Sequence, residues 1–246
     1  MVILKFFLAL GWTSLAMAGV SFEKKDTING VNVQTGKSDS TRVYQGTIQK
    51  TLNYPMDVVI KGITNFHEKC NNEYKDKREL TDKGFDCRYH NDNLIETLVI
   101  RDIKKDGWSK EQNEIDRFVL GRRIYNRGEF SYYELVKIFE MKNKQGQRTL
   151  TVKQSMLDES EAKTYLNPKL EKESAFDKSS SEFVLTETKP NETNFEYTYQ
   201  AETTHWILNK EISVPQVFSS ISKSILDLLN TVSTESALNT RDVASN

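Results

Sequence analysis

The chain has 246 residues, and its 34 Lys and Arg against 35 Asp and Glu give a formal net charge of −1. The charges are interspersed, which excludes the basic footprint of a nucleic-acid-binding protein. Three scattered histidines and a Cys-x(16)-Cys pair have no metal-ligand spacing. No Gly-x-Ser-x-Gly or His-Glu-x-x-His motif occurs. We therefore expect no metal, no cofactor, no nucleic-acid partner and no catalytic residues.

Residues 1–18 have the features of a secretory signal peptide. Lys5 is followed by an apolar run, and Ala16-Met17-Ala18 resembles a cleavage site. The run is shorter than the ~20 apolar residues that span a bilayer. No Cys follows the cleavage site, so we expect no lipoprotein anchor. These features predict a secreted or periplasmic protein without a transmembrane segment in the mature chain.

The two cysteines, Cys70 and Cys87, flank a polar segment. In an exported protein, an even pair favours a disulfide over two free thiols. On the chain-entropy model such a bridge stabilises the fold by ~3 kcal/mol.

The first half of the chain predicts an arm, a strand and a short helix. Residues 19–41 are polar and rich in Gly, Asn, Ser and Thr, which is typical of a flexible N-terminal arm. Alternating polar and apolar residues predict a strand over 42–52 with one buried face. Pro55 suits the first turn of a helix, and apolar residues from Met56 to Phe66 then recur at helical spacing.

A series of antiparallel hairpins follows, because Gly- and Asn-containing turns separate alternating segments. The charged segment 158–181 is predicted to be a solvated connection or a lid. The predicted strands are 97–103, 115–125, 129–141, 148–157, 181–188 and 194–206.

The segment Ser213–Val232 predicts one long amphipathic helix. Val217, Ile221, Ile225 and Leu228 recur at helical spacing and form one apolar stripe. Ser213 and Gln216 resemble a capping box at the start of this helix. The polar residues 233–246 are expected to be a disordered tail.

This order of elements resembles the START-like, or SRPBCC, helix-grip superfamily. Three stretches carry the resemblance: Val43–Phe66, Ile115–Leu157 and Phe183–Val232. The resemblance implies an α+β domain over 42–232, with a curved antiparallel sheet wrapped around the long C-terminal helix. It also implies an elongated apolar cavity between sheet and helix. Members commonly bind or carry lipids, sterols or other hydrophobic molecules, and a minority are cyclases or related enzymes.

If the sheet wraps the helix, the parity of each strand predicts which side chains line the cavity. Gln154 and His205 share the inward parity and are predicted polar anchors for a ligand. The predicted apolar and aromatic lining comprises Tyr44, Ile48, Leu150, Val152, Met156, Phe183, Leu185, Phe195, Tyr197, Tyr199, Val217, Ile221, Ile225 and Leu228.

The leading hypothesis is an exported, soluble protein that binds a hydrophobic small molecule, first of all a lipid, between the sheet and the helix. Two alternatives stay open. One is an exported enzyme of cyclase or hydrolase type on the same scaffold, and the other is an interaction module with a solid core. The apolar pattern alone fits a filled interior as well as a hollow one.

Overall fold

The computed structural model describes residues 20–64, 94–102, 114–125, 134–157, 160 and 176–244. Three predicted features lie outside these residues: the signal peptide 1–18, the Cys70–Cys87 bridge, and residues 158, 159 and 161–175 of the charged segment 158–181. No helix in the part described has the length and apolar character that crossing a bilayer requires.

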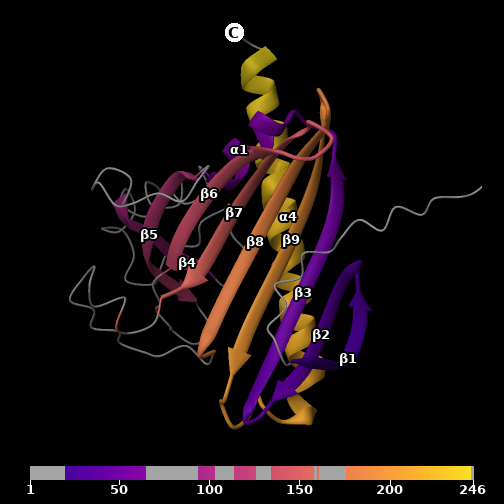
Figure 1. Cartoon of the computed structure of the whole chain (residues 1–246), viewed down its shortest axis with the longest axis vertical. Coiled ribbons are helices and arrows are strands. Elements are labelled where there is room, and N and C mark those ends of the chain that lie inside the picture. Colours follow the sequence, from indigo (N-terminus) through magenta and orange to yellow (C-terminus); the bar gives the residue numbers. More distant parts are fainter. Residues whose placement is uncertain are drawn as a thin grey trace, which may run out of the picture.

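The strands form one antiparallel sheet (Figure 1), in the order β1-β2-β3-β9-β8-β7-β6-β5-β4. The chain therefore crosses once from β3, near one edge, to β4 at the other edge, and returns as a meander that ends beside β3. The strands are β1 (Ser21–Ile28), β2 (Val31–Ser38), β3 (Thr41–Leu52), β4 (Leu94–Asp102), β5 (Glu114–Tyr125), β6 (Glu134–Lys142), β7 (Arg148–Met156), β8 (Lys178–Lys189) and β9 (Glu192–Thr203).

The predicted strands from residue 42 onward are all present. Strand β9 shows why the alternation was informative: Phe195 and Tyr197 are buried, and Glu196 between them is exposed. The turn between β6 and β7 is closed by Gly146, which has a φ of 78° and follows an Asn143 side chain that accepts two backbone hydrogen bonds. These turn residues fix the register of the hairpin.

The predicted flexible arm is wrong, because residues 21–38 form the hairpin β1–β2. Asn29 and Gly30 both have positive φ, 52° and 83°, and make the tight turn. Val31 and Val33 then point into the core and are buried. The polar composition hid this alternation. Strand β1 itself has the exposed charged sequence 23–26 and a bulge between Phe22 and Lys24.

Among the residues that the structure describes, the main helices are α1 (Met56–Thr64) and α4 (Val214–Ala244), and the short 3-10 helix η1 (Glu211–Ser213) precedes α4. The predicted capping box is wrong in its geometry, because the Ser213 hydroxyl donates to the carbonyl of Ile207 at 2.7 Å. Residue Ser213 therefore tethers the preceding loop.

The predicted disordered tail is also wrong, because α4 continues to Ala244. Helix α1 packs on this extension. A Cβ added at Gly62 would lie 3.4 Å from Glu235 Cβ and 3.5 Å from Ser236 Oγ, so the two helices meet closely at the glycine. Both Glu235 and Ser236 are buried there. Tertiary packing, which the polar sequence does not announce, stabilises the last turns.

Helix α4 packs on one face of the sheet, called here the inner face, mainly over β2 and β3. Phe218 on α4 meets Tyr44 on β3 edge to face, with ring centroids 6.3 Å apart. A Cβ at Gly46 would lie 2.5 Å from Ile221 and 2.7 Å from Ile225, so this glycine lets the helix approach the strand. The predicted fold class, an antiparallel sheet holding a long C-terminal helix, is confirmed.

Candidate ligand-binding face

The register of the strands arranges the inner face in rows that run across β6, β7, β8, β9 and β3. The first row is apolar throughout and consists of Ile138, Val152, Phe183, Tyr197 and Ile48. All five side chains are buried. A neighbouring row places Leu150, Leu185 and Phe195 side by side on β7, β8 and β9.

Aromatic rings form the centre of these two rows. The Phe183 ring lies 4.6 Å from the Tyr197 ring and 5.9 Å from the Phe195 ring, measured between centroids. Such tilted and edge-to-face pairs add to the stability that burial provides. The cluster gives the middle of the inner face a rigid apolar surface.

The next row along the strands is more polar. It contains Val136, Gln154, Ser181, Tyr199 and Gly46 in register. The Ser181 hydroxyl donates to Gln154 Oε1 at 3.0 Å, and Gln154 is buried. A buried amide beside apolar rows places hydrogen-bonding capacity at one defined end of the face.

Two helices bound this face on different sides. Helix α4 covers β2 and β3, whereas α1 contacts β8 and β9. The Thr193 hydroxyl donates to the Tyr54 carbonyl at 2.9 Å, which ties the start of β9 to the segment before α1. In the strand order, β6 and β7 lie beyond β9 and β8, away from the strands β2 and β3 that α4 covers.

Most of the predicted lining residues share this interior. Met156, Tyr199 and Leu228 are half-buried. Their role in binding a ligand stays a prediction. The buried members of the predicted set are Tyr44, Ile48, Leu150, Val152, Gln154, Phe183, Leu185, Phe195, Tyr197, Val217, Ile221 and Ile225.

The predicted anchor His205 is wrong. Strand β9 ends at Thr203, so the strand parity no longer applies two residues later. His205 is exposed in the following turn, where its ring stacks on Trp206 with centroids 6.4 Å apart. Conversely, Val33, Val136 and Ile138 belong to the same core and were missed, although each lies in an alternating pair of apolar residues.

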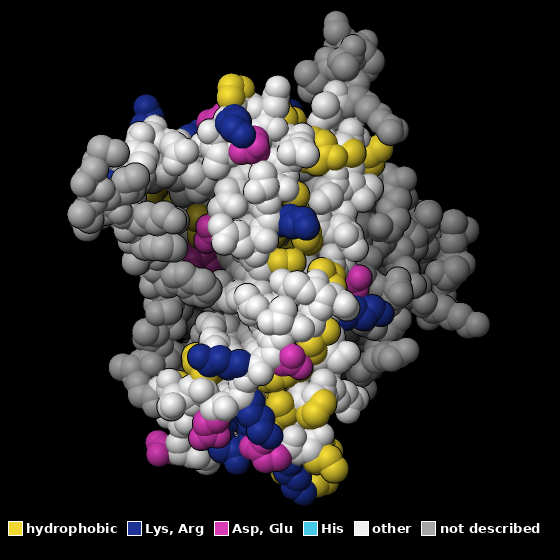
Figure 2. Space-filling model, turned by 90° about the vertical axis from the view of Figure 1, so that its right-hand side faces the viewer, with side chains coloured by type: hydrophobic (Ala, Val, Ile, Leu, Met, Phe, Trp, Pro, Cys, Tyr) yellow, Lys and Arg dark blue, Asp and Glu magenta, His cyan; other side chains and the backbone are white. Residues whose placement is uncertain are grey.

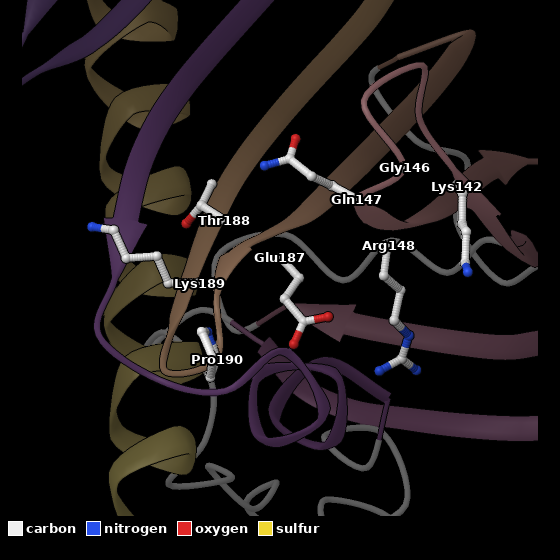
Figure 3. A pocket seen from close by; sticks show the side chains of 8 residues that line it. All are labelled: Lys142, Gly146, Gln147, Arg148, Glu187, Thr188, Lys189 and Pro190. Atoms are coloured by element: carbon white, nitrogen blue, oxygen red, sulfur yellow. The ribbon is translucent and has the colours of Figure 1, made fainter.

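A pocket lies where the hairpins β6–β7 and β8–β9 turn (Figure 3), with a volume of about 460 Å³. Its charged groups are partly compensated, because Arg148 binds both Asp57 and Glu140 at 2.5 Å. The hydrogen bonds that Arg148 donates to Glu140 and Asp57 raise the pKa of its guanidinium. The pocket lacks the apolar rows of the inner face. It is lined by Lys142, Gly146, Gln147, Arg148, Glu187, Thr188, Lys189 and Pro190.

The loop from β9 to α4 is fastened to β3 and β1 by a group of polar contacts. Arg42 is buried and pairs with Glu211, and its Nε donates to the Asn209 carbonyl at 3.1 Å. The Tyr44 hydroxyl donates to the Leu208 carbonyl at 2.6 Å. Burial raises the pKa of Tyr44. Hydrogen bonds from Lys24 and Arg42 lower the pKa of Glu211 to about 2.

The depressed pKa of Glu211 predicts that folding stability falls on acidification. The ionised carboxylate stabilises the fold above its ordinary pKa, and this contribution is lost as the pH falls towards about 2. We expect Glu211→Gln to flatten the pH dependence of the free energy of unfolding between pH 6 and pH 2, measured by urea denaturation. Glu23→Gln, on an exposed position of β1, is the control and should leave the profile unchanged. Identical profiles for wild type and Glu211→Gln would contradict the assignment.

No protein-family model matches the chain, and curated protein sequences yield no significant match. Among solved structures, human STARD10 is similar at a TM-score of 0.49 and 11% identity, covering 94% of this chain and 80% of that one. Human StAR-related lipid transfer protein 5 gives 0.49 and 12%, covering 92% and 90%. A StAR-related lipid transfer protein fragment from Xanthomonas axonopodis gives 0.46 and 11%, covering 89% and 99%. These values describe a likeness in the layout of strands and helices, and they assign no ligand.

Proposed function

We propose that the protein binds a hydrophobic small molecule, first of all a lipid, on the inner face of the sheet between β6–β9 and α4. The supporting observation is the pair of apolar rows centred on Phe183, which end at the polar row of Gln154 and Tyr199. An apolar surface with a few placed polar groups is the usual chemistry of a site for such ligands.

The dimensions of the face suit an elongated ligand. Four adjacent strands at ~4.8 Å spacing give a width of roughly 14 Å from β6 to β9. Each CH₂ group buried there contributes ~0.8 kcal/mol to binding. The Gln154 amide and the Tyr199 hydroxyl would hydrogen-bond to the polar end of the ligand, which fixes its direction along the face.

The proposal is tested by native mass spectrometry of the purified protein and by titration with a fluorescent fatty-acid probe. Co-purified lipid and saturable probe binding are expected. Val152→Trp adds bulk to the central apolar row and should displace part of the bound probe. Probe binding should weaken by about tenfold or more, because losing an apolar contact of this size costs about 1.4 kcal/mol or more.

The matched control is Lys153→Trp, because Lys153 is the next residue of β7 and is exposed. It adds the same bulk on the outer face and should bind the probe as the wild type does. Absence of both co-purified lipid and probe binding would overturn the proposal, and so would equal weakening by the two tryptophans in folded protein.

Export is a further part of this proposal and is supported by the sequence of residues 1–18. An N-terminus at Gly19 in the mature protein, read by intact mass, would bear it out. The same mass measurement before and after reduction tests the proposed Cys70–Cys87 disulfide. In the part of the chain that the structure describes, no cluster of His, Cys, Asp and Glu could hold a metal ion.

A further inference from the structure

The loop that joins β9 to α4 exposes three large apolar side chains at one end of the molecule. The side chain of Ile212 is 85% exposed, that of Trp206 66% and that of Ile207 43%. The loop lies at the lower end of Figure 1, away from the C-terminus of α4. We call residues 204–213 the apolar loop.

The apolar loop has a fixed backbone, so these side chains are not exposed by fraying. The Ile207 carbonyl accepts hydrogen bonds from the Ser213 hydroxyl at 2.7 Å and from the Lys210 backbone at 3.0 Å. The next two carbonyls, of Leu208 and Asn209, are held by Tyr44 and Arg42 of β3. A surface held in this way loses little conformational entropy when it binds.

The charge of the apolar loop suits a negatively charged partner. The carboxylate of Glu211 is held by Arg42 and Lys24, which neutralises the loop's own acid. Lys210 is exposed, and its ammonium lies 4.8 Å from the centroid of the Trp206 ring. Figure 2 shows apolar side chains at this end of the molecule beside charged side chains of both signs, Lys and Arg as well as Asp and Glu.

We propose that the apolar loop docks the protein on an anionic lipid bilayer, with Trp206, Ile207 and Ile212 entering the interface. Tryptophan favours the level of the lipid head groups, and a lysine beside it keeps its ammonium in water near their phosphates. Three side chains on a protruding loop cover far less than the ~800 Å² per partner of a stable protein interface. A bilayer is therefore favoured over a second copy of the chain. This proposal does not depend on a ligand at the inner face.

The test uses the mature chain from Gly19 with Trp108→Phe, so that Trp206 is its remaining tryptophan and the apolar run of residues 1–18 is absent. Vesicles of phosphatidylcholine with phosphatidylglycerol should shift its fluorescence to the blue. Doxyl-labelled lipids in these vesicles should quench it. Ile207→Ser with Ile212→Ser should weaken partitioning of this chain by at least about tenfold. Vesicles of phosphatidylcholine alone should bind more weakly than the anionic vesicles, because they lack the charge that attracts Lys210.

The matched control is Met141→Ser, since Met141 is also an exposed apolar side chain, 46% exposed, but lies at the opposite ends of the strands. It should leave partitioning unchanged. Absence of vesicle binding would overturn the proposal. Vesicle binding without quenching of Trp206 would overturn it too, because another surface would then be responsible. A concentration-dependent blue shift without vesicles, with a dimer in size-exclusion chromatography, would assign the loop to a second copy instead.

Discussion

Replacing Ile225 with aspartate is expected to unfold the protein. Ile225 is 2% exposed on α4, and its side chain would lie within 2.7 Å of a Cβ at Gly46. A carboxylate there would be buried without a cation among the apolar side chains that the described core contributes. The free energy of unfolding should fall by about 5 kcal/mol or more, which is comparable with the whole stability of a typical domain. Circular dichroism should show no cooperative thermal transition.

The neighbouring Ser224 provides the control, because it is exposed one residue earlier on the same helix. Ser224→Asp introduces the same charge with a change of stability within about 0.5 kcal/mol. A cooperative transition near the wild-type temperature for Ile225→Asp would mean that α4 does not press this face on the sheet.

Arg42→Ala is expected to lower the free energy of unfolding by about 2–4 kcal/mol, the second-largest effect. Arg42 is 1% exposed, so its removal leaves a void, and the Asn209 carbonyl and Glu211 both lose their partner. Because Arg42 joins β3 to the segment before α4, the loop 204–213 should also become more accessible to proteases. Urea denaturation measures the first effect, and limited proteolysis measures the second.

Lys37→Ala is the matched control, since Lys37 pairs with Arg42 in the register of β2 and β3 but is exposed. It removes one cation from the same end of the sheet with little burial, so stability should change by less than about 1 kcal/mol. Equal losses for the two variants would show that net charge, and not the buried contacts of Arg42, stabilises this loop.

The sequence predicted those elements whose periodicity reports burial. The alternation in β9 and the helical spacing from Val217 to Ile225 both mark faces that the structure buries. Periodicity does not reveal an element whose formation depends on tertiary contacts. Residues 21–38 look like a loop in composition, but β2 pairs with β3 along its length and brings Val31 and Val33 into the core.

The candidate site was likewise predicted only in part. Parity along β7, β8 and β9 placed Val152, Phe183 and Tyr197 on one face, and the register then brought them into one row. Parity could not reveal which strands are neighbours, so Ile138 of β6 was not assigned to that row. It also could not show where β9 ends, which is why His205 was assigned to the interior.

The bulge in β1 bears on how this protein avoids aggregation. An open sheet ends in strands with unpaired backbone groups, and such edges recruit strands from other chains. At one edge, the bulge between Phe22 and Lys24 breaks the regular spacing that an incoming strand would need. The exposed charges of residues 23–26 add electrostatic and desolvation costs to any such pairing. The hairpin that extends the sheet thereby also terminates it, so that concentrated solutions are protected from edge-to-edge polymerisation on this side.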